Sequence, residues 1–196
     1  MKKTIFFILA SYLFLGAGCS HQIQLSPDLD ALRGSNSSTK IDKNVGYYVS
    51  RLDKEVAVVT PGGGGDNVKY YPYKDTEAAL NIILGKIFHK VYAIPSLKDK
   101  AYIAEKNISY IFKPKIRTNS RSESILTWPP THFTMDLTCV AISPAGDTVW
   151  SKKVSAEGIA EFDEFKSNFS LSASRASEKA FKLMLKEIDS ASVFRQ

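Results

Sequence analysis

Cys139 is the residue of this chain whose type most readily suggests covalent chemistry, because a thiolate is a strong nucleophile. It lies in phase with Phe133, Met135 and Leu137, which alternate with other residues at the period of a β-strand and therefore share its buried face. Burial in apolar surroundings raises the pKa of a thiol and makes it unreactive. We therefore expect Cys139 to be structural and not catalytic.

Other residue sets that could do chemistry lack the required spacing or context. Asp66 follows the glycines 62–65, where a phosphate-binding loop needs a lysine and a hydroxyl residue. His132 and Asp136 would share a strand face but lie about 13 Å apart, too far to hold one metal ion. A run of carboxylates could support glycoside cleavage, but on a polar connection it is more typical of a solvated stretch. The run comprises Glu157, Glu161, Asp163 and Glu164. We therefore expect no catalytic residue, no metal site and no cofactor.

Aromatic residues form the most distinctive candidate for a binding site. They gather around the glycine run and in a Trp-Pro-Pro corner. Tyrosine and tryptophan bury well and keep a polar group, which is typical of interfaces. We interpret them as a candidate partner-binding surface; the alternative is that these rings cover the core beneath two loops. The candidate residues are Tyr47, Tyr48, Tyr71, Tyr73 and Trp128.

Two stretches that must position these residues have apolar side chains at the period of an α-helix. The first begins with Asp75 as the N-cap and extends toward residue 91. The second begins at Ser170 or Ser172 and extends to about residue 188. A shorter helix is expected within residues 97–106.

Strand-like segments alternate with these helices. The segment 68–73 is expected at a sheet edge, because Pro72 cannot donate a hydrogen bond to a neighbouring strand. The order of elements predicts an α+β fold: a mixed, mainly antiparallel sheet with two main helices packed on one face. The predicted strands cover residues 45–50, 56–60, 68–73, 91–94, 108–116, 133–141 and 148–156.

The first 44 residues differ in composition from the rest. Lys2 and Lys3 precede an apolar run of about 12 residues, which is too short to cross a membrane and is followed by small residues. We predict a signal peptide over residues 1–18. Residues 19–44 are mainly polar and are predicted to be a flexible tether. A single folded domain is then expected over residues 45–192.

The charge of the chain narrows the choice of partner. The formal net charge is +6 and becomes +4 when Lys2 and Lys3 leave with the signal peptide. This mild positive charge suits an acidic partner or anionic lipid headgroups, and it does not indicate nucleic acid. Cys19 and Cys139 are the two cysteines, so a modified Cys19 would leave no internal disulfide.

The sequence LFLGAGCS, residues 13–20, resembles the lipobox of bacterial lipoproteins. The resemblance implies cleavage before Cys19, a diacylglycerol on its sulfur and acylation of its new amino group. Gly16 stands where leucine is commonest in that motif. In enterobacterial-type sorting, a serine such as Ser20 after the cysteine implies anchoring in the outer membrane, facing the periplasm.

Two further segments, GGGGD at 62–66 and TWPPT at 127–131, are similar to those of a family of uncharacterised proteobacterial envelope lipoproteins. The resemblance implies no activity. We expect an outer-membrane-anchored lipoprotein with a non-catalytic periplasmic domain for binding or assembly, and an envelope protein as its partner. The alternative is an auxiliary lipoprotein of an ABC-type lipid transport system that binds a hydrophobic ligand. An envelope hydrolase is a third hypothesis, which would depend on Glu161 or Glu164.

Overall fold

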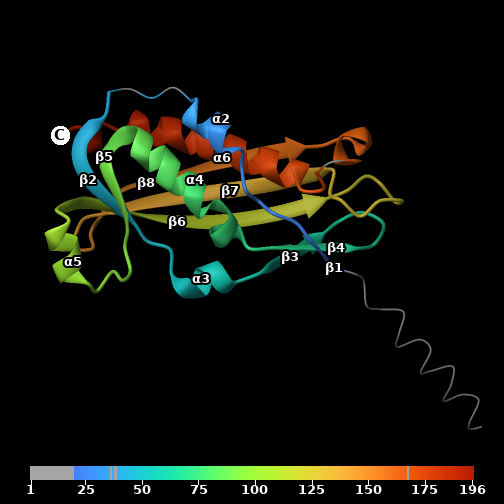
Figure 1. Ribbon diagram of the computed structural model, residues 1–196, viewed down its shortest axis with the longest axis horizontal. Coiled ribbons are helices and arrows are strands. Elements are labelled where there is room, and N and C mark those ends of the chain that lie inside the picture. The colour runs from blue at the N-terminus through green and yellow to red at the C-terminus, as the bar shows by residue number, and fades with distance from the viewer. Residues whose placement is uncertain (1–19, 36, 38, 167) are drawn as a thin grey trace, which may run out of the picture.

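The strand with the clearest alternation in the sequence lies within the larger of two sheets. The computed structural model describes residues 20–35, 37, 39–166 and 168–196. β7 (His132–Ile142) buries Phe133, Met135, Leu137, Cys139 and Ala141 on one face, as predicted. A turn leads from β7 to β8 (Thr148–Ile159), and the larger sheet has the order β5-β2-β6-β7-β8 (Figure 1).

Two helices cover one face of this sheet, which confirms the predicted α+β arrangement. α4 (Pro72–Ile87) and α6 (Leu171–Asp189) pack against the sheet and against each other (Figure 1). α4 begins earlier than predicted, because proline is favoured in the first turn of a helix. Asp75 is therefore not the N-cap. Its carboxylate instead accepts a hydrogen bond from the backbone N–H of Leu25 at 3.1 Å.

The smaller sheet has the order β1-β4-β3 and joins the start of the chain to its middle. β1 (Ser20–Gln22) pairs in parallel with β4 (Asn67–Tyr70), and β3 (Val58–Pro61) pairs with β4 in the antiparallel sense. β4 is thus a central strand. The prediction of an edge strand was wrong, because Pro72 lies beyond β4 and begins α4.

The remaining elements connect and extend these layers. In the larger sheet, the pairing of β2 with β5 and β6 is parallel, whereas β6, β7 and β8 are antiparallel neighbours, so the sheet is mixed. The short helix α3 was not predicted. The bounds are α2 Leu29–Arg33, β2 Ile41–Tyr47, α3 Arg51–Glu55, β5 Phe88–Ala93, α5 Lys100–Glu105, β6 Ile108–Arg121, and the 3-10 helices η1 Phe162–Lys166 and η2 Ser192–Phe194.

The segment predicted to be a flexible tether is part of the folded domain wherever the structure describes it. Ile23, Leu25 and Leu32 are at most 2% exposed and belong to the main hydrophobic core. α2 packs on α4 and α6, and β2 already begins at Ile41. The tether prediction was wrong because these few apolar residues are spread among polar ones. Cys19 and the predicted signal peptide lie outside the described residues.

Hydroxyl groups join the smaller sheet to the larger one. The Oγ1 of Thr60 on β3 lies 2.6 Å from the Oγ of Ser120 on β6 and 3.2 Å from the phenol oxygen of Tyr70. That phenol also lies 2.8 Å from Thr118 Oγ1, and burial raises its pKa. These buried groups satisfy one another, so the two sheets are held at a fixed separation.

None of the helices in the described ranges combines the length and the apolar character needed to cross a bilayer.

The packing of the amino-terminal segment gives a direct test of its role in stability. We expect Leu32→Ala to lower the free energy of unfolding by about 2–5 kcal/mol, because it leaves a cavity between α2 and the helices beneath it. Urea denaturation measures the change. Leu52→Ala is the matched control: Leu52 is 70% exposed on α3, so we expect a change within about 0.5 kcal/mol. Equal effects in the two variants would contradict the packing described here.

Candidate functional site

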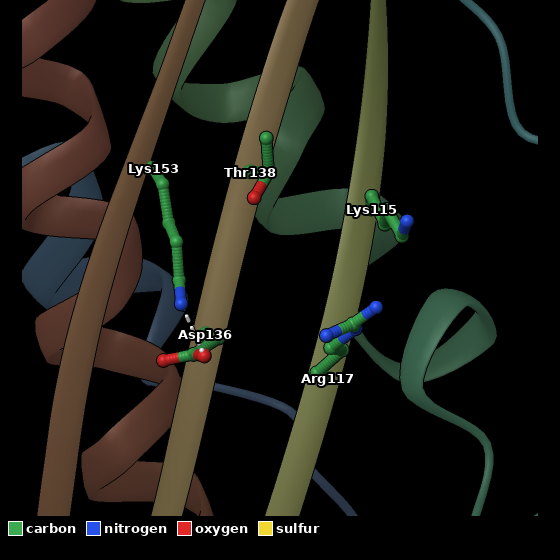
Figure 2. A pocket seen from close by; sticks show the side chains of 5 residues that line it. All are labelled: Lys115, Arg117, Asp136, Thr138 and Lys153. Atoms are coloured by element: carbon green, nitrogen blue, oxygen red, sulfur yellow. Dashed lines mark ion pairs between the residues drawn. The ribbon is translucent and has the colours of Figure 1, made fainter.

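The face of the larger sheet opposite α4 and α6 carries a row of polar and charged side chains. Strand register sets their positions: Lys115 pairs with Thr138, and Thr138 pairs with Lys153. Arg117 pairs with Asp136 in the next row of the same face. Directly paired residues lie about 4.5–5.5 Å apart at Cβ, so three strands bring these side chains together. Figure 2 shows them projecting from the same side of the sheet.

These five residues line a hollow of about 250 Å³, which we call the basic hollow. The Nζ of Lys153 lies 2.6 Å from a carboxylate oxygen of Asp136 (Figure 2). Ser155 donates a hydrogen bond of 2.6 Å to the other oxygen. Lys153, Ser155 and the charge of Arg117 lower the pKa of Asp136, which therefore stays ionised at neutral pH. Lys153 offsets that charge, so the hollow is positive overall.

Lys115 and Arg117 give the hollow its excess of positive charge. Both side chains are exposed, and within the described residues no carboxylate lies at ion-pair distance from either. Lys113 and Arg121 continue the same face along β6. Single exposed ion pairs contribute little to affinity, but several like charges on one surface attract an oppositely charged partner over a distance. The arrangement is suited to binding anionic groups.

Two of the residues considered for catalysis, Cys139 and Glu164, have environments that do not suit a catalytic role. Cys139 is fully buried, as predicted, and this burial raises its pKa to about 12. Both oxygens of Glu164 accept hydrogen bonds from Arg175, at 2.6 and 3.0 Å. Arg175, followed by the backbone N–H of Glu161, lowers the pKa of Glu164 to about 2, whereas a glycosidase acid needs a raised pKa. Among the described residues no group of three or more His, Cys, Asp or Glu side chains has an arrangement that could hold a metal ion.

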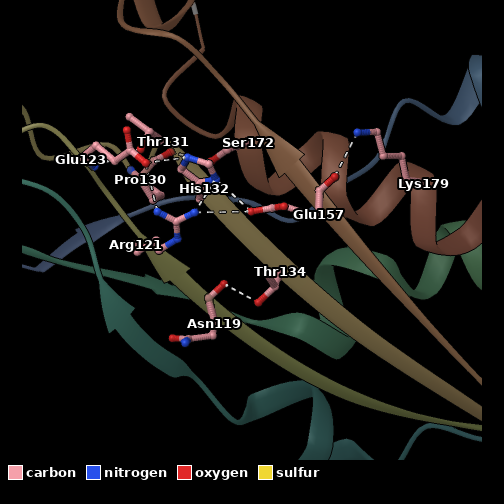
Figure 3. A network of polar contacts seen from close by, with 10 residues as sticks. All are labelled: Asn119, Arg121, Glu123, Pro130, Thr131, His132, Thr134, Glu157, Ser172 and Lys179. Carbon is pink, nitrogen blue, oxygen red and sulfur yellow. Dashed lines mark hydrogen bonds and ion pairs between the residues drawn. The ribbon is translucent and has the colours of Figure 1, made fainter.

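His132 belongs to a charged network at the end of the sheet (Figure 3). Its Nδ1 lies 2.8 Å from Glu157 on β8, and its Nε2 lies 3.3 Å from Glu123 in the β6–β7 loop. Arg121 at the end of β6 lies 3.1 Å from Glu123. The network joins three strands to the loop that connects two of them. His132 is therefore held by Glu157 and Glu123, and none of its ion pairs and hydrogen bonds within the described residues involves Asp136.

The candidate aromatic residues do not form one surface. Tyr47 is 7% exposed on the helix side of the sheet; burial, followed by the charge of Glu77, raises its pKa to about 12. Tyr48 packs with a second apolar cluster that includes Ile103. The phenol oxygen of Tyr73 accepts a hydrogen bond from the backbone of β6. Successive residues of an extended segment point to opposite sides, so neighbouring tyrosines separate.

Tyr71 and Trp128 are the two remaining candidates. The Tyr71 ring lies 5.8 and 5.7 Å from the Nζ atoms of Lys69 and Lys74. Trp128 stacks on His21 of β1, with 4.2 Å between ring centroids and 13° between planes. His21 also lies 2.9 Å from Asp66, so it is part of the fold and not of a tether.

The glycine run packs against the backbone of Thr127 and Trp128. The N–H of Gly63 donates a 2.8 Å hydrogen bond to the carbonyl of Trp128. A Cβ added to Gly63 would overlap the carbonyl oxygen of Thr127, and one added to Gly62 would overlap that of Trp128. Glycine at these positions therefore allows a close approach of the two backbones. The GGGGD and TWPPT segments, noted separately in the sequence, thus contact each other.

The sequence analysis missed an apolar hollow beside Trp128. Its volume is about 240 Å³, and we call it the apolar hollow. Leu126 and Phe162, at its entrance, are 89% and 64% exposed. Exposed apolar residues in a polar loop were the signal that could have found it. The lining residues are Leu126, Thr127, Trp128, Pro129, Phe162, Phe165 and Phe169.

Comparison with known proteins gives distant structural resemblances. No protein-family model matches the chain, and no curated protein matches it. A PelC point variant from Paraburkholderia phytofirmans, whose structure is a dodecamer, is 13% identical to this chain. The TM-score is 0.46, and the match covers 81% of this chain and 95% of that chain. A DUF330 protein from Xanthomonas campestris is 10% identical, with a TM-score of 0.40 over 88% of this chain and 98% of that chain.

A protein from Caulobacter crescentus described as a lipoprotein is also among the structures found. It is 12% identical, with a TM-score of 0.35 over 67% of this chain and 85% of that chain. TM-scores below 0.5 carry no inference from these proteins to this chain.

The contact between the glycine run and Trp128 can be tested by adding one methyl group. We expect Gly63→Ala to destabilise the fold by about 1–3 kcal/mol, because the new Cβ would overlap backbone that has little room to move. Gly85→Ala is the control: this glycine lies within α4, its added Cβ would make an ordinary contact, and we expect stabilisation by up to about 1 kcal/mol. Thermal unfolding measures both. A neutral Gly63→Ala would contradict the close approach.

Proposed function

We propose that this chain is an outer-membrane lipoprotein whose folded domain is non-catalytic and binds an acidic envelope protein. The observation that carries the proposal is the uncovered basic face of the larger sheet. Lys115, Arg117 and Lys153 converge there, while the helices cover the opposite face. Cys139 is buried and Glu164 is held in an ion pair with Arg175, which supports a binding role.

The size and lining of the basic hollow favour a protein surface over a small molecule. Its volume of about 250 Å³ is below the roughly 300–1,000 Å³ typical of ligand pockets, and its lining is mainly charged, whereas small-molecule sites are mostly apolar. Charged surfaces of this kind raise the rate of encounter and help to select partners. Because the side chains are exposed, the interaction should weaken as salt increases.

The membrane anchor is inferred from the lipobox at Cys19. Ser20, the next residue, is the first residue of β1, so a lipid on Cys19 would be joined to the folded domain without an intervening linker. Two or more acyl chains give a stable anchor, whereas a single chain binds only marginally. The serine at position 20 supports the outer membrane as the destination.

A hydrophobic-ligand carrier for an ABC-type lipid transport system is the second candidate. The apolar hollow favours it, because its lining is mostly aromatic and aliphatic. Its volume of about 240 Å³ is smaller than the roughly 300–1,000 Å³ typical of ligand pockets. The core next to it is filled by Tyr70 and Phe133, both fully buried. These features favour the basic face as the functional surface.

Metabolic labelling tests the anchor. Cells that express the full chain are grown with a radiolabelled fatty acid, and we expect the mature protein to carry the label and to fractionate with the outer membrane. Cys19→Ala should abolish the label, whereas Cys139→Ala should keep it if the protein folds. An unlabelled mature protein, or one whose first residue is not Cys19, would refute the anchor.

Site-specific photo-crosslinking tests the basic face. A photoreactive amino acid at Thr138, in intact cells, is expected to give a defined crosslinked protein, and its acidic surface should be evident once it is identified. Charge reversal of Arg117 and Lys115 to glutamate should remove the crosslink, because repulsion replaces attraction. Lys90→Glu, an exposed change on β5, is the matched control and should leave the crosslink unchanged. A crosslink that persists in the charge-reversed protein would refute the proposal.

A further inference from the structure

Four exposed apolar side chains gather at one end of the molecule, around the entrance of the apolar hollow. We call them the apolar rim: Ile125, Leu126, Phe162 and Phe169, which are 85%, 89%, 64% and 50% exposed. The first two lie in the β6–β7 loop, Phe162 begins η1, and Phe169 follows the end of η1. Leu126, Phe162 and Phe169 line the same hollow, so they form one surface. Large apolar patches of this kind mark sites of contact with proteins or membranes.

The start of the described chain lies at the same end. His21 stacks on Trp128, and Trp128 lies 5.0 Å from Phe169 between ring centroids. β1 and the β6–β7 connection are found at one end of the molecule in Figure 1. Ser20, the residue before His21, therefore lies near the rim. Cys19 is the residue that precedes Ser20 in the sequence.

We infer that the apolar rim inserts into the acyl region of the membrane that holds the lipid anchor. The inference rests on the proposed acylation of Cys19, which would place acyl chains next to β1. The absence of a linker between Cys19 and β1 then brings this end of the domain to the bilayer surface. Leucine, isoleucine and phenylalanine side chains are the types that insert at a membrane interface.

The charges around the rim indicate which membrane surface it suits. Glu164 is paired with Arg175, and Glu123 with Arg121. Glu161 and Asp163, which flank Phe162, are exposed. Carboxylates at this position disfavour a strongly anionic surface. The contact therefore depends on burial of apolar side chains and should occur on zwitterionic phospholipid, with little dependence on salt.

This orientation leaves the basic hollow accessible. β7 begins at His132, immediately after the rim loop, and runs away from it. Thr138 lies six residues further on, or roughly 20 Å at about 3.4 Å per residue. The hollow would therefore face water beyond the headgroups while the rim is buried.

The two tryptophans of the chain allow a test of this arrangement. Trp128 lies beside the rim, whereas Trp150 on β8 packs against Phe194 near the carboxyl terminus. The acylated full-length protein is placed in vesicles of zwitterionic phosphatidylcholine with brominated acyl chains, which quench nearby tryptophan. In Trp150→Phe we expect quenching to remove roughly half of the Trp128 emission, since inserted side chains reach about 5–10 Å into the interface. In Trp128→Phe the Trp150 emission should hardly change.

A charge substitution shows whether the rim side chains cause the contact. Leu126→Asp with Ile125→Asp, in the Trp150→Phe background, should abolish the quenching while circular dichroism stays unchanged. Leu52→Asp is the matched control, since Leu52 is also an exposed leucine but lies on α3, and it should keep the quenching. Equal quenching of the two tryptophans, or quenching that survives the rim substitutions, would overturn the inference.

Two controls separate this inference from the proposed function. Mass spectrometry and vesicle flotation establish whether the protein is acylated and bound. A floating, acylated protein whose Trp128 is not quenched refutes the rim contact and leaves the anchor in place. A protein without acyl groups refutes the anchor itself. Concentration-dependent dimers that disappear in the rim variant, without quenching, would assign the rim to a second copy of the chain and overturn the inference.

Discussion

The contact of the glycine run with the backbone of Thr127 and Trp128 is the constraint on which the arrangement of the two sheets depends. At this point the two backbone segments are in contact, and a Cβ atom at Gly62 or Gly63 would overlap a carbonyl oxygen of Trp128 or Thr127. The contact brings the smaller sheet against the end of the larger sheet. It also places His21 beneath Trp128, so the beginning of the folded chain is fixed relative to the β6–β7 loop. Nearby hydroxyl groups on both sheets satisfy one another and tolerate little displacement.

The two faces of the larger sheet differ in character: residues on one face stabilise the fold, and residues on the other are available for binding. One face is covered by α4 and α6 and contains the buried residues of β7, so it supplies most of the apolar burial. The other face is free to carry charge, because its side chains contribute little to the core. Repulsion between Lys115, Arg117 and Lys153 is reduced by Asp136, which is held as a carboxylate between them. Such a surface can carry several like charges at small cost to the fold.

The sequence predicted those elements of the fold whose buried residues recur at a regular spacing. The alternation in β7 and the apolar stripe of α6 identified their buried faces, because each element packs a whole face on its neighbours. The amino-terminal segment has no such repeat. Ile23, Leu25 and Leu32 are buried singly, by contacts with helices far away in the sequence, so composition alone suggested a tether.

The candidate site could not be predicted for a related reason. Lys115 and Lys153 come together through the register of three strands, and no spacing in the sequence records that register. The tyrosines show a different error, because residues close in the sequence were expected to share one surface. Tyr47 and Tyr48 are adjacent in the sequence, but the alternation of the extended chain places one against α4 and the other in a separate cluster. Proximity in sequence was therefore a poor guide to a shared surface.

The absence of a linker after residue 19 changes what the proposed anchor can do. A flexible segment of about 25 residues would have let the domain sample a range of roughly 25–30 Å from the membrane. With β1 beginning at Ser20, height and orientation would both be fixed by the fold. The basic hollow would then be presented at one distance from the bilayer, along the direction of β7. A partner that is itself embedded in the membrane would meet this surface already aligned, so less orientational freedom would be lost on binding.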